Sequence, residues 1–333
     1  MITIENLIVI DDRCAWPNLT LMPNGDIVAT IFNQPCHGKW EGDAECWGSA
    51  DGGKIWVYRG TPAKHEPGQN RMNVGGGLAK NGDLLIMCSG WSDRPKLGMG
   101  PPKPFHECKV LPALLSRSKD GGRTWEVKEN ILPPRPYTDD CELVPFGNIA
   151  IAADGALCQG VYTGRSVHIA RSYDDGHTWP ELALIAENRF CECDILHLGN
   201  GKWLAVTRNR KGLTNDLFAS EDDGRTWKFS ETLTLPCTSA AHIMRLKDGR
   251  IIFSFGDRCF NRKGIDIRLS EDEGRTWSPP YRLKNISADD CGYPSTVELP
   301  GGRMLTAYYA SEDGAYKRYH MGVVLWDLKE MFG

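Results

Sequence analysis

The octapeptide SEDDGRTW, residues 220–227, is one of five similar segments that decide the fold of this chain of 333 residues. The other four are SADGGKIW (residues 49–56), SKDGGRTW (118–125), SYDDGHTW (172–179) and SEDEGRTW (270–277). The segments start 69, 54, 48 and 50 residues apart, and they contain five of the eleven tryptophans. A repeat with a period near 50 residues is typical of an array or a propeller.

Each octapeptide is interpreted as a hairpin turn. Its Asp can accept hydrogen bonds from the backbone N–H groups of the turn, and its Gly supplies the positive φ that the turn needs. Thr and Trp suit the strand that follows, where Trp can wedge between neighbouring sheets. We therefore expect the Asp and Trp residues of the octapeptides to hold turns and not to bind a substrate.

The chain carries a second repeat, in which a Gly turn joins two short apolar strands. Its six copies begin at Asn18, Gly77, Cys141, Cys193, Ala241 and Ser295. Because these runs are bounded by turns and lack helical periodicity, they predict an all-β fold. Six units of about 55 residues predict a six-bladed β-propeller that forms a single domain over residues 1–333. We expect residues 1–10 to complete the last blade, because closure of the ring removes exposed strand edges.

Composition argues against several classes of function. The net charge is −4, and no basic block is present, so binding of nucleic acid is not expected. No apolar run approaches the roughly 20 residues that span a membrane, and the N-terminus lacks the features of a signal peptide, which predicts a cytoplasmic protein. The twelve cysteines form no CxxC pair and the eight histidines are scattered, so we predict free thiols, no metal site and no cofactor.

The octapeptide is the Asp-box, and the chain resembles the sialidase (neuraminidase) superfamily of six-bladed, BNR-repeat propellers over essentially its whole length. The resemblance implies a fold with five Asp-boxes and a carbohydrate substrate. It implies the activity of an exo-α-glycosidase that acts on a terminal acidic sugar of a glycan or glycoconjugate. The implied mechanism retains configuration through a tyrosyl-glycosyl intermediate, an exception to the usual pair of carboxylates.

The resemblance assigns the nucleophile to Tyr293, in the segment DCGYPST (residues 290–296) that opens the first strand of the last unit. A free Tyr has a pKa of about 10, so it needs a partner base at neutral pH. The family supplies a Glu from the fourth blade. Glu192, nine residues before Gly201, matches its position.

Sialidases also hold the substrate carboxylate with three Arg side chains, because a planar guanidinium binds a carboxylate through two hydrogen bonds and keeps its charge. Arg208, at the end of the segment WLAVTR (residues 203–208), matches the second of them. Arg262, eight residues before the fifth octapeptide, matches the third. Arg258 and Arg210 are neighbours that could substitute.

The sequence departs from the family at the first Arg. In the segment RCAWPN (residues 13–18), Ala15 stands at the Arg position and Trp16 follows it. Arg13, two residues away on the same strand face, or Arg71, near the start of the next unit, could replace the missing residue. With Trp16 in the site, the pocket could also fit a differently placed carboxylate or none.

The second departure concerns the general acid, an Asp in the first-blade loop of the family. Counting from the flanking motifs leads to Lys39 or His37, and neither is an Asp. Glu41 and Asp43 are close enough to serve if the loop is rebuilt, and His37 could itself be the acid.

Other features leave alternatives open. The inserts at residues 33–43 and 90–109 are long loops of the kind that carry function. Three tryptophans flank them and could stack on a sugar face or pack the loops, namely Trp40, Trp47 and Trp91. The pairs at residues 11–12, 139–140 and 289–290 are all Asp-Asp, and they could cap turns, supply an acid or bind a hard cation. The alternative functions are a catalytically silent glycan-binding propeller, and a glycosidase or lyase of different specificity that uses Asp or His residues.

Overall fold

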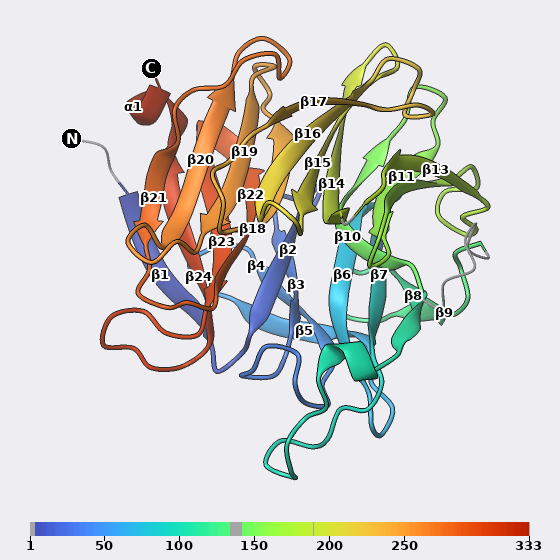
Figure 1. The fold of residues 1–333 in the computed structure, drawn as a ribbon, viewed down its shortest axis with the longest axis vertical. Helices are drawn as coiled ribbons and strands as arrows, with labels where there is room; N and C mark the ends of the chain where they lie inside the picture. Colours follow the sequence, from blue (N-terminus) through green and yellow to red (C-terminus); the bar gives the residue numbers. More distant parts are fainter. Residues whose placement is uncertain (1–3, 134–141, 189, 333) are drawn as a thin grey trace.

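The computed structural model describes residues 4–133, 142–188 and 190–332, and this part of the chain is built almost entirely of β-strands. Its 24 strands are accompanied only by the short helices η1 (Phe105–Glu107), η2 (Pro300–Gly302) and α1 (Leu328–Phe332). The prediction of an all-β chain is therefore confirmed in its coarse form. Figure 1 shows the strands grouped in sheets that surround the centre of the molecule.

Three sheets contain four consecutive strands, and each strand pairs antiparallel with the next one along the chain. The first sheet comprises β2 (Ala15–Leu21), β3 (Ile27–Phe32), β4 (Ala44–Ser49) and β5 (Val57–Ala63). The second comprises β14 (Phe190–Gly199), β15 (Lys202–Asn209), β16 (Thr214–Ser220) and β17 (Lys228–Thr232). The third comprises β18 (Thr238–Arg245), β19 (Ile251–Asp257), β20 (Gly264–Ser270) and β21 (Tyr281–Asn285).

A further sheet joins the two ends of the chain. It comprises β22 (Cys291–Glu298), β23 (Arg303–Ala310), β24 (His320–Asp327) and β1 (Ile4–Asp11). Strand β1 pairs antiparallel with β24, from Ile4 opposite Trp326 to Asp11 opposite His320. The N-terminal strand is thus the outer strand of the sheet that holds the C-terminal strands, as the blue and red ribbons in Figure 1 show.

The remaining sheet has eight strands and consists of two sets of four. One set comprises β6 (Asn70–Leu78), β7 (Leu84–Trp91), β8 (Val110–Ser118) and β9 (Glu126–Lys128). The other comprises β10 (Val144–Ile151), β11 (Leu157–Tyr162), β12 (Val167–Ser172) and β13 (Glu181–Ala186). The first strands of the two sets, β6 and β10, pair in parallel at only two positions, Gly75 with Gly147 and Gly76 with Asn148.

The first strands of the sets lie innermost. Each contacts the next in chain order, through β2, β6, β10, β14, β18 and β22, and β22 in turn contacts β2. Figure 1 shows these strands around the centre of the view. Side chains at their ends therefore meet although they are far apart in the sequence.

The sequence interpretation of the third unit needs a correction. The segment that begins at Cys141 was expected to turn at Gly147, but Gly147 lies inside β10, and the turn to β11 falls near Gly155. Gly147 has a φ of 78°, and a Cβ atom there would lie 2.3 Å from the Asp194 carboxylate. The glycine is thus required by a close approach between strands rather than by a turn. Cys141 itself lies outside the described residues.

The five octapeptides form the same turn, each between the third and fourth strands of a set. The Ser hydroxyl donates to the Asp carboxylate at 2.8–2.9 Å, in the pairs Ser49–Asp51, Ser118–Asp120, Ser172–Asp174, Ser220–Asp222 and Ser270–Asp272. The same hydroxyl accepts a hydrogen bond from the backbone N–H of the Gly four residues later, as in Gly224 at 3.0 Å. The Asp and Ser side chains are therefore used by the turn itself, as the sequence interpretation expects.

The octapeptide tryptophans extend these turns into the core. Four of the indole N–H groups donate to the Gly carbonyl three residues earlier, at 2.9–3.2 Å, from Trp56, Trp125, Trp179 and Trp227. The indole N–H of Trp277 has no hydrogen-bond partner in the described part of the chain. Trp179 is only 1% exposed and packs in the cluster that includes Leu85 and Leu157.

We expect Trp179→Ala to lower the free energy of unfolding by about 3–5 kcal/mol, because it leaves a large cavity in the core and removes an indole hydrogen bond. Trp125→Ala is the matched control, since its indole makes the same hydrogen bond but is partly exposed. Chemical denaturation of both variants measures the difference. Equal losses would show that the shared turn, and not burial, governs stability.

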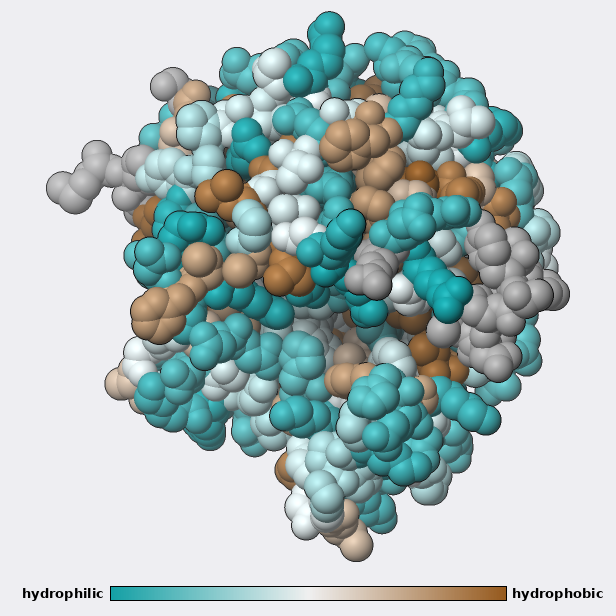
Figure 2. All heavy atoms as spheres, viewed as in Figure 1, coloured by the Kyte–Doolittle hydropathy of each residue, from teal (hydrophilic) through white to brown (hydrophobic). Residues whose placement is uncertain are grey.

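The surface in Figure 2 is mainly hydrophilic on the face shown, and hydrophobic residues are scattered across it rather than gathered in one large patch. No helix within the described ranges is long and apolar enough to cross a membrane.

Candidate active site

A cavity of about 490 Å³ lies where the innermost strands meet. Its lining residues are Trp16, His37, Met72, Asn73, Val74, Trp91, Phe105, His106, Phe146, Tyr162, Glu192, Arg208, Arg210 and Tyr293. They come from β2, β6, β10, β14 and β22, from neighbouring strands and from three connecting segments. A pocket of this size, with mainly aromatic walls and a few polar groups, is typical of a small-molecule site.

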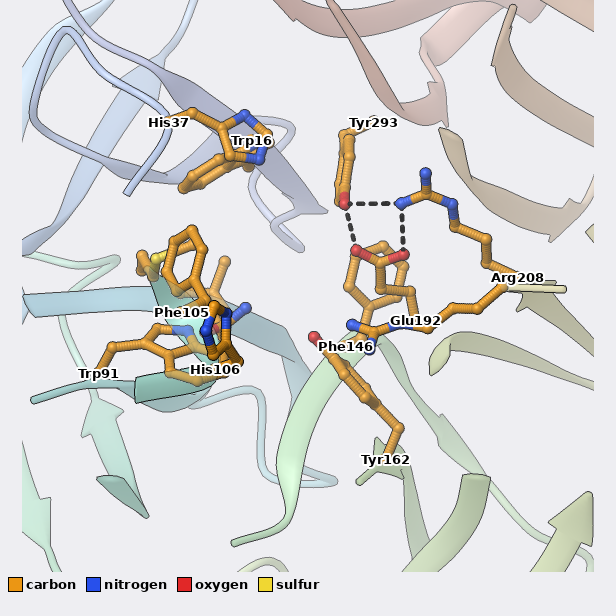
Figure 3. Close-up of a pocket in the computed structure, with 14 residues that line it drawn as sticks. Trp16, His37, Trp91, Phe105, His106, Phe146, Tyr162, Glu192, Arg208 and Tyr293 are labelled. Atoms are coloured by element: carbon orange, nitrogen blue, oxygen red, sulfur yellow. Dashed lines mark hydrogen bonds and ion pairs between the residues drawn. The ribbon is translucent and has the colours of Figure 1, made fainter. Parts of the chain in front are cut away.

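Backbone irregularities direct three of these side chains into the cavity. The strand register shifts around Trp16, Glu192 and Tyr293, near the starts of β2, β14 and β22. Their φ angles are 46°, 40° and 49°, a left-handed conformation that costs free energy for residues other than Gly. A β-bulge of this kind re-aims a side chain. The three bulges thus give a shared reason why these residues point toward one another in Figure 3.

Tyr293, Glu192 and Arg208 form the hydrogen-bonded cluster at the centre of the site (Figure 3). The Tyr293 hydroxyl donates to Oε1 of Glu192, and Nη1 of Arg208 donates to Oε2 of Glu192 at 3.1 Å. The same Nη1 lies 3.5 Å from the Tyr293 hydroxyl. The residues that the sequence assigned as nucleophile, base and second Arg are therefore brought together.

Burial and the charges of this cluster move the pKa values of Glu192 and Tyr293 in opposite directions. Burial alone would raise the pKa of Glu192, but the Arg208 charge and the hydrogen bonds from Tyr293 and Arg208 outweigh it and lower the pKa below its ordinary value. Burial, and then the Glu192 charge, raise the pKa of Tyr293 well above its ordinary value. At neutral pH the structure thus holds a neutral phenol against an ionised carboxylate.

Two more arginines surround the cluster. Arg210 lines the cavity and donates from Nε to Sγ of Cys191 at 3.3 Å. The Arg258 guanidinium lies 5.7 Å from the centroid of the Tyr293 ring, and its Nη2 donates to the Tyr309 hydroxyl at 2.7 Å. Both were named in the sequence only as possible substitutes.

Of the three candidates for the general acid, only His37 lines the cavity. Glu41 accepts the backbone N–H of Gly68 at 2.6 Å, and Asp43 accepts from Nδ1 of His65 at 2.7 Å. Both carboxylates are therefore occupied in holding their own loop against the segment that precedes β6. The loop places His37, and not an acidic residue, on the cavity wall.

Three of the predicted arginines lie outside the cavity lining. Arg13 donates to the backbone carbonyl of Asp12 and pairs with Glu45, and Arg71 donates to the carbonyl of Pro112 at 3.1 Å. Arg262 is 39% exposed in its side chain and donates from Nε to Oδ2 of Asp257 at 2.9 Å.

The position of Arg262 outside the cavity lining, although the sequence had assigned it to the substrate, has a physical cause. Arg262 lies in the loop between β19 and β20, where the nearby Asp257 carboxylate binds it. Arg258, four residues earlier, instead turns inward to the Tyr293 ring. Trp16 does line the cavity, with its ring centroid 6.2 Å from that of Tyr293.

The sequence pointed to Trp91 but not to the rest of the aromatic wall formed by the insert at residues 90–109. Trp91 and Phe105 meet edge to face, with centroids 4.9 Å apart, and His106 lies beside them. The insert is held by Arg94, which is 1% exposed, lies 4.7 Å from the Phe105 centroid and donates to backbone carbonyls of the loop. The Gly- and Pro-rich composition signalled a functional loop but not which residues reach the cavity.

Of the other open features, Asp290 contacts the lining residue His37, and the rest of those that the structure describes lie away from the cavity lining. Asp11 and Asp289 form ion pairs with Arg318 and Lys263, and residues 139–140 lie outside the described residues. Trp40 and Trp47 pack against a core cluster and are not in the lining. In the described ranges, no group of three or more His, Cys, Asp or Glu side chains could hold a metal ion.

Comparisons with known proteins relate the chain to BNR-repeat proteins and to a sialidase. The BNR repeat-like domain family matches residues 105–305. A sialidase of Bacteroides fragilis (strain YCH46) is 25% identical over 222 residues, which cover 61% of this chain and 39% of that protein. The chain thus spans well under half the length of this curated relative.

Solved structures share the fold. A protein of unknown function from Dyadobacter fermentans DSM 18053 superposes with a TM-score of 0.81, at 22% identity, over 97% of this chain and 98% of that one. The NanB sialidase from Streptococcus pneumoniae gives a TM-score of 0.73, at 14% identity, over 97% of this chain and 70% of that one. At these identities the similarity concerns the fold.

Proposed function

Because the chain belongs to the BNR repeat-like domain family, as a divergent member of the sialidase superfamily, we propose that it is a sialidase-like exo-α-glycosidase. It acts on a terminal acidic sugar of a glycan or glycoconjugate, and it retains configuration through a tyrosyl-glycosyl intermediate. One observation carries this proposal. The Tyr293 hydroxyl donates a hydrogen bond directly to the buried Glu192 carboxylate inside the cavity.

The mechanism follows from this hydrogen bond. A neutral phenol is a weak nucleophile, and an adjacent base activates it by taking its proton as the new bond forms. Glu192 is ionised because of Arg208, so it can accept the Tyr293 proton while the phenol oxygen attacks the anomeric carbon. Arg208, whose Nη1 lies 3.5 Å from the phenol oxygen, and Arg258, over the Tyr293 ring, stabilise the negative charge that develops on the phenol oxygen as its proton leaves, in a buried setting where charges interact strongly.

The charge of the lining supports an acidic sugar. Arg208 and Arg210 line the cavity, and Glu192 is its only carboxylate among the described lining residues. Arginine suits a carboxylate because it can form two parallel hydrogen bonds. Since Trp16 occupies the neighbourhood of the absent first Arg, the proposed substrate carboxylate is bound from the side of β14 and β15.

We also propose that residues 1–333 form one six-bladed propeller with five Asp-boxes. The contacts of the six innermost strands in chain order, including β22 with β2, support this arrangement. The pairing of β1 with β24 supports completion of the last blade by the N-terminal strand.

One observation favours a second candidate, a catalytically silent glycan-binding propeller. Arg13, Arg71 and Arg262 all bind protein groups outside the cavity, so a grip of three arginines on one carboxylate is not assembled from them. Such a protein would bind sugars through the aromatic wall without cleaving them. A glycosidase or lyase that depends on Asp or His residues alone is the remaining alternative.

A panel of 4-methylumbelliferyl α-glycosides, containing N-acetylneuraminic acid, glucuronic acid and neutral sugars, tests the function. We expect release of the fluorophore from an acidic sugar, with the first sugar product in the α configuration by proton NMR. Binding by calorimetry without turnover of any glycoside would favour the silent propeller. A β product would exclude the tyrosyl intermediate.

A further inference from the structure

A second polar cluster lies across the cavity from Glu192 and Arg208, and its members are His37 and Asp290. His37 belongs to the loop between β3 and β4, lines the cavity, and has a side chain that is 36% exposed. Its Nδ1 lies 2.8 and 3.0 Å from the two carboxylate oxygens of Asp290, the residue directly before β22. Figure 3 shows His37 beside Trp16, on the wall opposite Arg208.

Asp290 is a carboxylate built to stay ionised. It also accepts hydrogen bonds from the hydroxyls of Tyr309, at 2.5 Å, and Tyr319, at 2.7 Å. Burial alone would raise the pKa of Asp290, but His37 and the two tyrosine hydroxyls outweigh it and hold the pKa well below its ordinary range. Asp290 does not line the cavity, and the lining residue that it contacts is His37.

An ionised carboxylate at Nδ1 has a defined effect on an imidazole. It fixes the ring orientation and holds a proton on Nδ1, which leaves Nε2 to exchange a proton with a reactant. The Trp16 ring, whose centroid is 4.9 Å from that of His37 at an interplanar angle of 88°, holds the ring from the side. His37 is therefore oriented by two contacts at the wall of the cavity.

The other titratable groups near the cavity lack this arrangement. Glu41 and Asp43 bind Gly68 and His65 outside the lining, and Glu192 is bound to Tyr293 and Arg208. The side chain of His106 is 81% exposed, and its nearest carboxylate is that of the adjacent residue, Glu107, at 3.7 Å from Nε2. Of the two histidines in the described lining, His37 is thus the one whose ring is oriented by a carboxylate from another part of the chain.

We propose that His37 is the general acid of the glycosidase and that Asp290 is its positioning residue. The inference rests on the proposed function and deepens it. In the first step, the C–O bond between Tyr293 and the anomeric carbon forms as the glycosidic bond breaks. The Tyr293 proton goes to Glu192, and the Nε2 proton of His37 goes to the departing oxygen.

The second step restores the enzyme. Water gives one proton to Nε2 of His37 as its oxygen attacks the anomeric carbon. The bond to Tyr293 breaks, and Glu192 returns a proton to the phenol oxygen. The net reaction is hydrolysis of one glycosidic bond, with no other reactant.

A continuous set of contacts joins the His37–Asp290 pair to the nucleophile Tyr293. Tyr309 donates to Asp290, Arg258 donates to Tyr309, and the Arg258 guanidinium lies over the Tyr293 ring. The acid and the nucleophile are therefore held by one network, which fixes their separation around the bound sugar.

The test compares two glycosides of N-acetylneuraminic acid that differ in their need for an acid. The 4-nitrophenyl α-glycoside releases a stable anion, whereas the methyl α-glycoside releases an alkoxide that must be protonated. We expect His37→Gln to lower kcat/KM by about 10²–10⁴-fold for the methyl glycoside and by less than about tenfold for the nitrophenyl glycoside. Asp290→Asn should give the same selective loss in weaker form.

His65→Gln is the matched control, because His65 also binds an Asp through Nδ1, at 2.7 Å, but lies outside the cavity lining. It should leave both rates within about twofold of the wild type. Thermal unfolding checks that each variant folds, and Asp290→Asn carries the test if His37→Gln does not fold.

Equal losses on both glycosides, or no loss on either, would overturn the assignment of His37 while the tyrosyl mechanism stands. Retained cleavage by a Tyr293→Phe variant would overturn the tyrosyl mechanism of the proposed function instead. If the wild type cleaves neither glycoside, nor any other member of the panel, both proposals fail.

Discussion

Tyr293→Phe is expected to abolish glycoside cleavage, lowering kcat on the order of 10⁴-fold or more, because it removes the only atom that forms the covalent intermediate. The fold should survive, since the phenol oxygen bonds only to Glu192 and Arg208 among the described residues, and the ring contacts with Trp16, Phe146 and Tyr309 remain. Steady-state rates with the best glycoside of the panel, and thermal unfolding, measure the two effects.

Tyr308→Phe is the matched control for this prediction. Tyr308 is also a buried tyrosine of the sheet that contains β22, but it lies outside the cavity lining. Its rate should stay within about twofold of the wild type. If Tyr293→Phe retained most of the activity, the covalent role of the phenol would be excluded.

Glu192→Gln is expected to lower kcat by about 10²–10⁴-fold, because a carboxamide cannot take the phenol proton during attack. The pH dependence of kcat/KM in the wild-type protein gives a second, related test of Glu192. Glu192 must be ionised to act, and its pKa is held below its ordinary value against burial. The acid limb of kcat/KM should therefore lie below about pH 4.3, the ordinary pKa of Glu.

An Arg208→Gln variant tests whether the pKa of Glu192 sets the acid limb of kcat/KM. Loss of the guanidinium charge leaves burial as the dominant influence on Glu192, so its pKa rises and the acid limb moves to higher pH. A profile of kcat/KM from low to neutral pH, for the wild type and the variant, measures the movement. An acid limb at the same pH in both proteins would contradict the role of Glu192 as the base.

The parts of the fold that the sequence predicted are those encoded by local hydrogen bonds. In each octapeptide, Ser, Asp and Gly are within five residues of one another, so the pattern specifies its turn without reference to the rest of the chain. The positions of Tyr293, Glu192 and Arg208 were found for a similar reason. Each stands at a fixed distance from a strand end, and strand ends of successive units meet at the centre.

The parts that could not be predicted depend on where a side chain points after a bulge or in a loop. Arg258 and Arg262 are four residues apart in one loop, and the long-range contact of Arg258 with Tyr309, together with the binding of Arg262 by Asp257, decides which of them faces inward. Gly147 looked like a turn residue because the approach of Asp194, 47 positions later in the sequence, leaves no local pattern.

The choice of His37 among the candidate acids, and most of the aromatic wall, could not be predicted for the same reason. His37 gains its role from Asp290, more than 250 residues away. Phe105 reaches the cavity because Arg94 holds the insert, and an Arg in a loop gives no signal of that kind by itself. The proposed mechanism depends above all on the covalent role of Tyr293.

Mass spectrometry of the protein incubated with a 3-fluoro-N-acetylneuraminyl fluoride tests this claim most directly, since the ring fluorine slows hydrolysis of a glycosyl-enzyme intermediate once the leaving fluoride has departed. We predict a mass increase of one fluorinated sugar, located by proteolysis on the peptide that contains Tyr293, and no adduct on Tyr293→Phe. An adduct on another residue, or fluoride release with inverted product and no adduct, would contradict it.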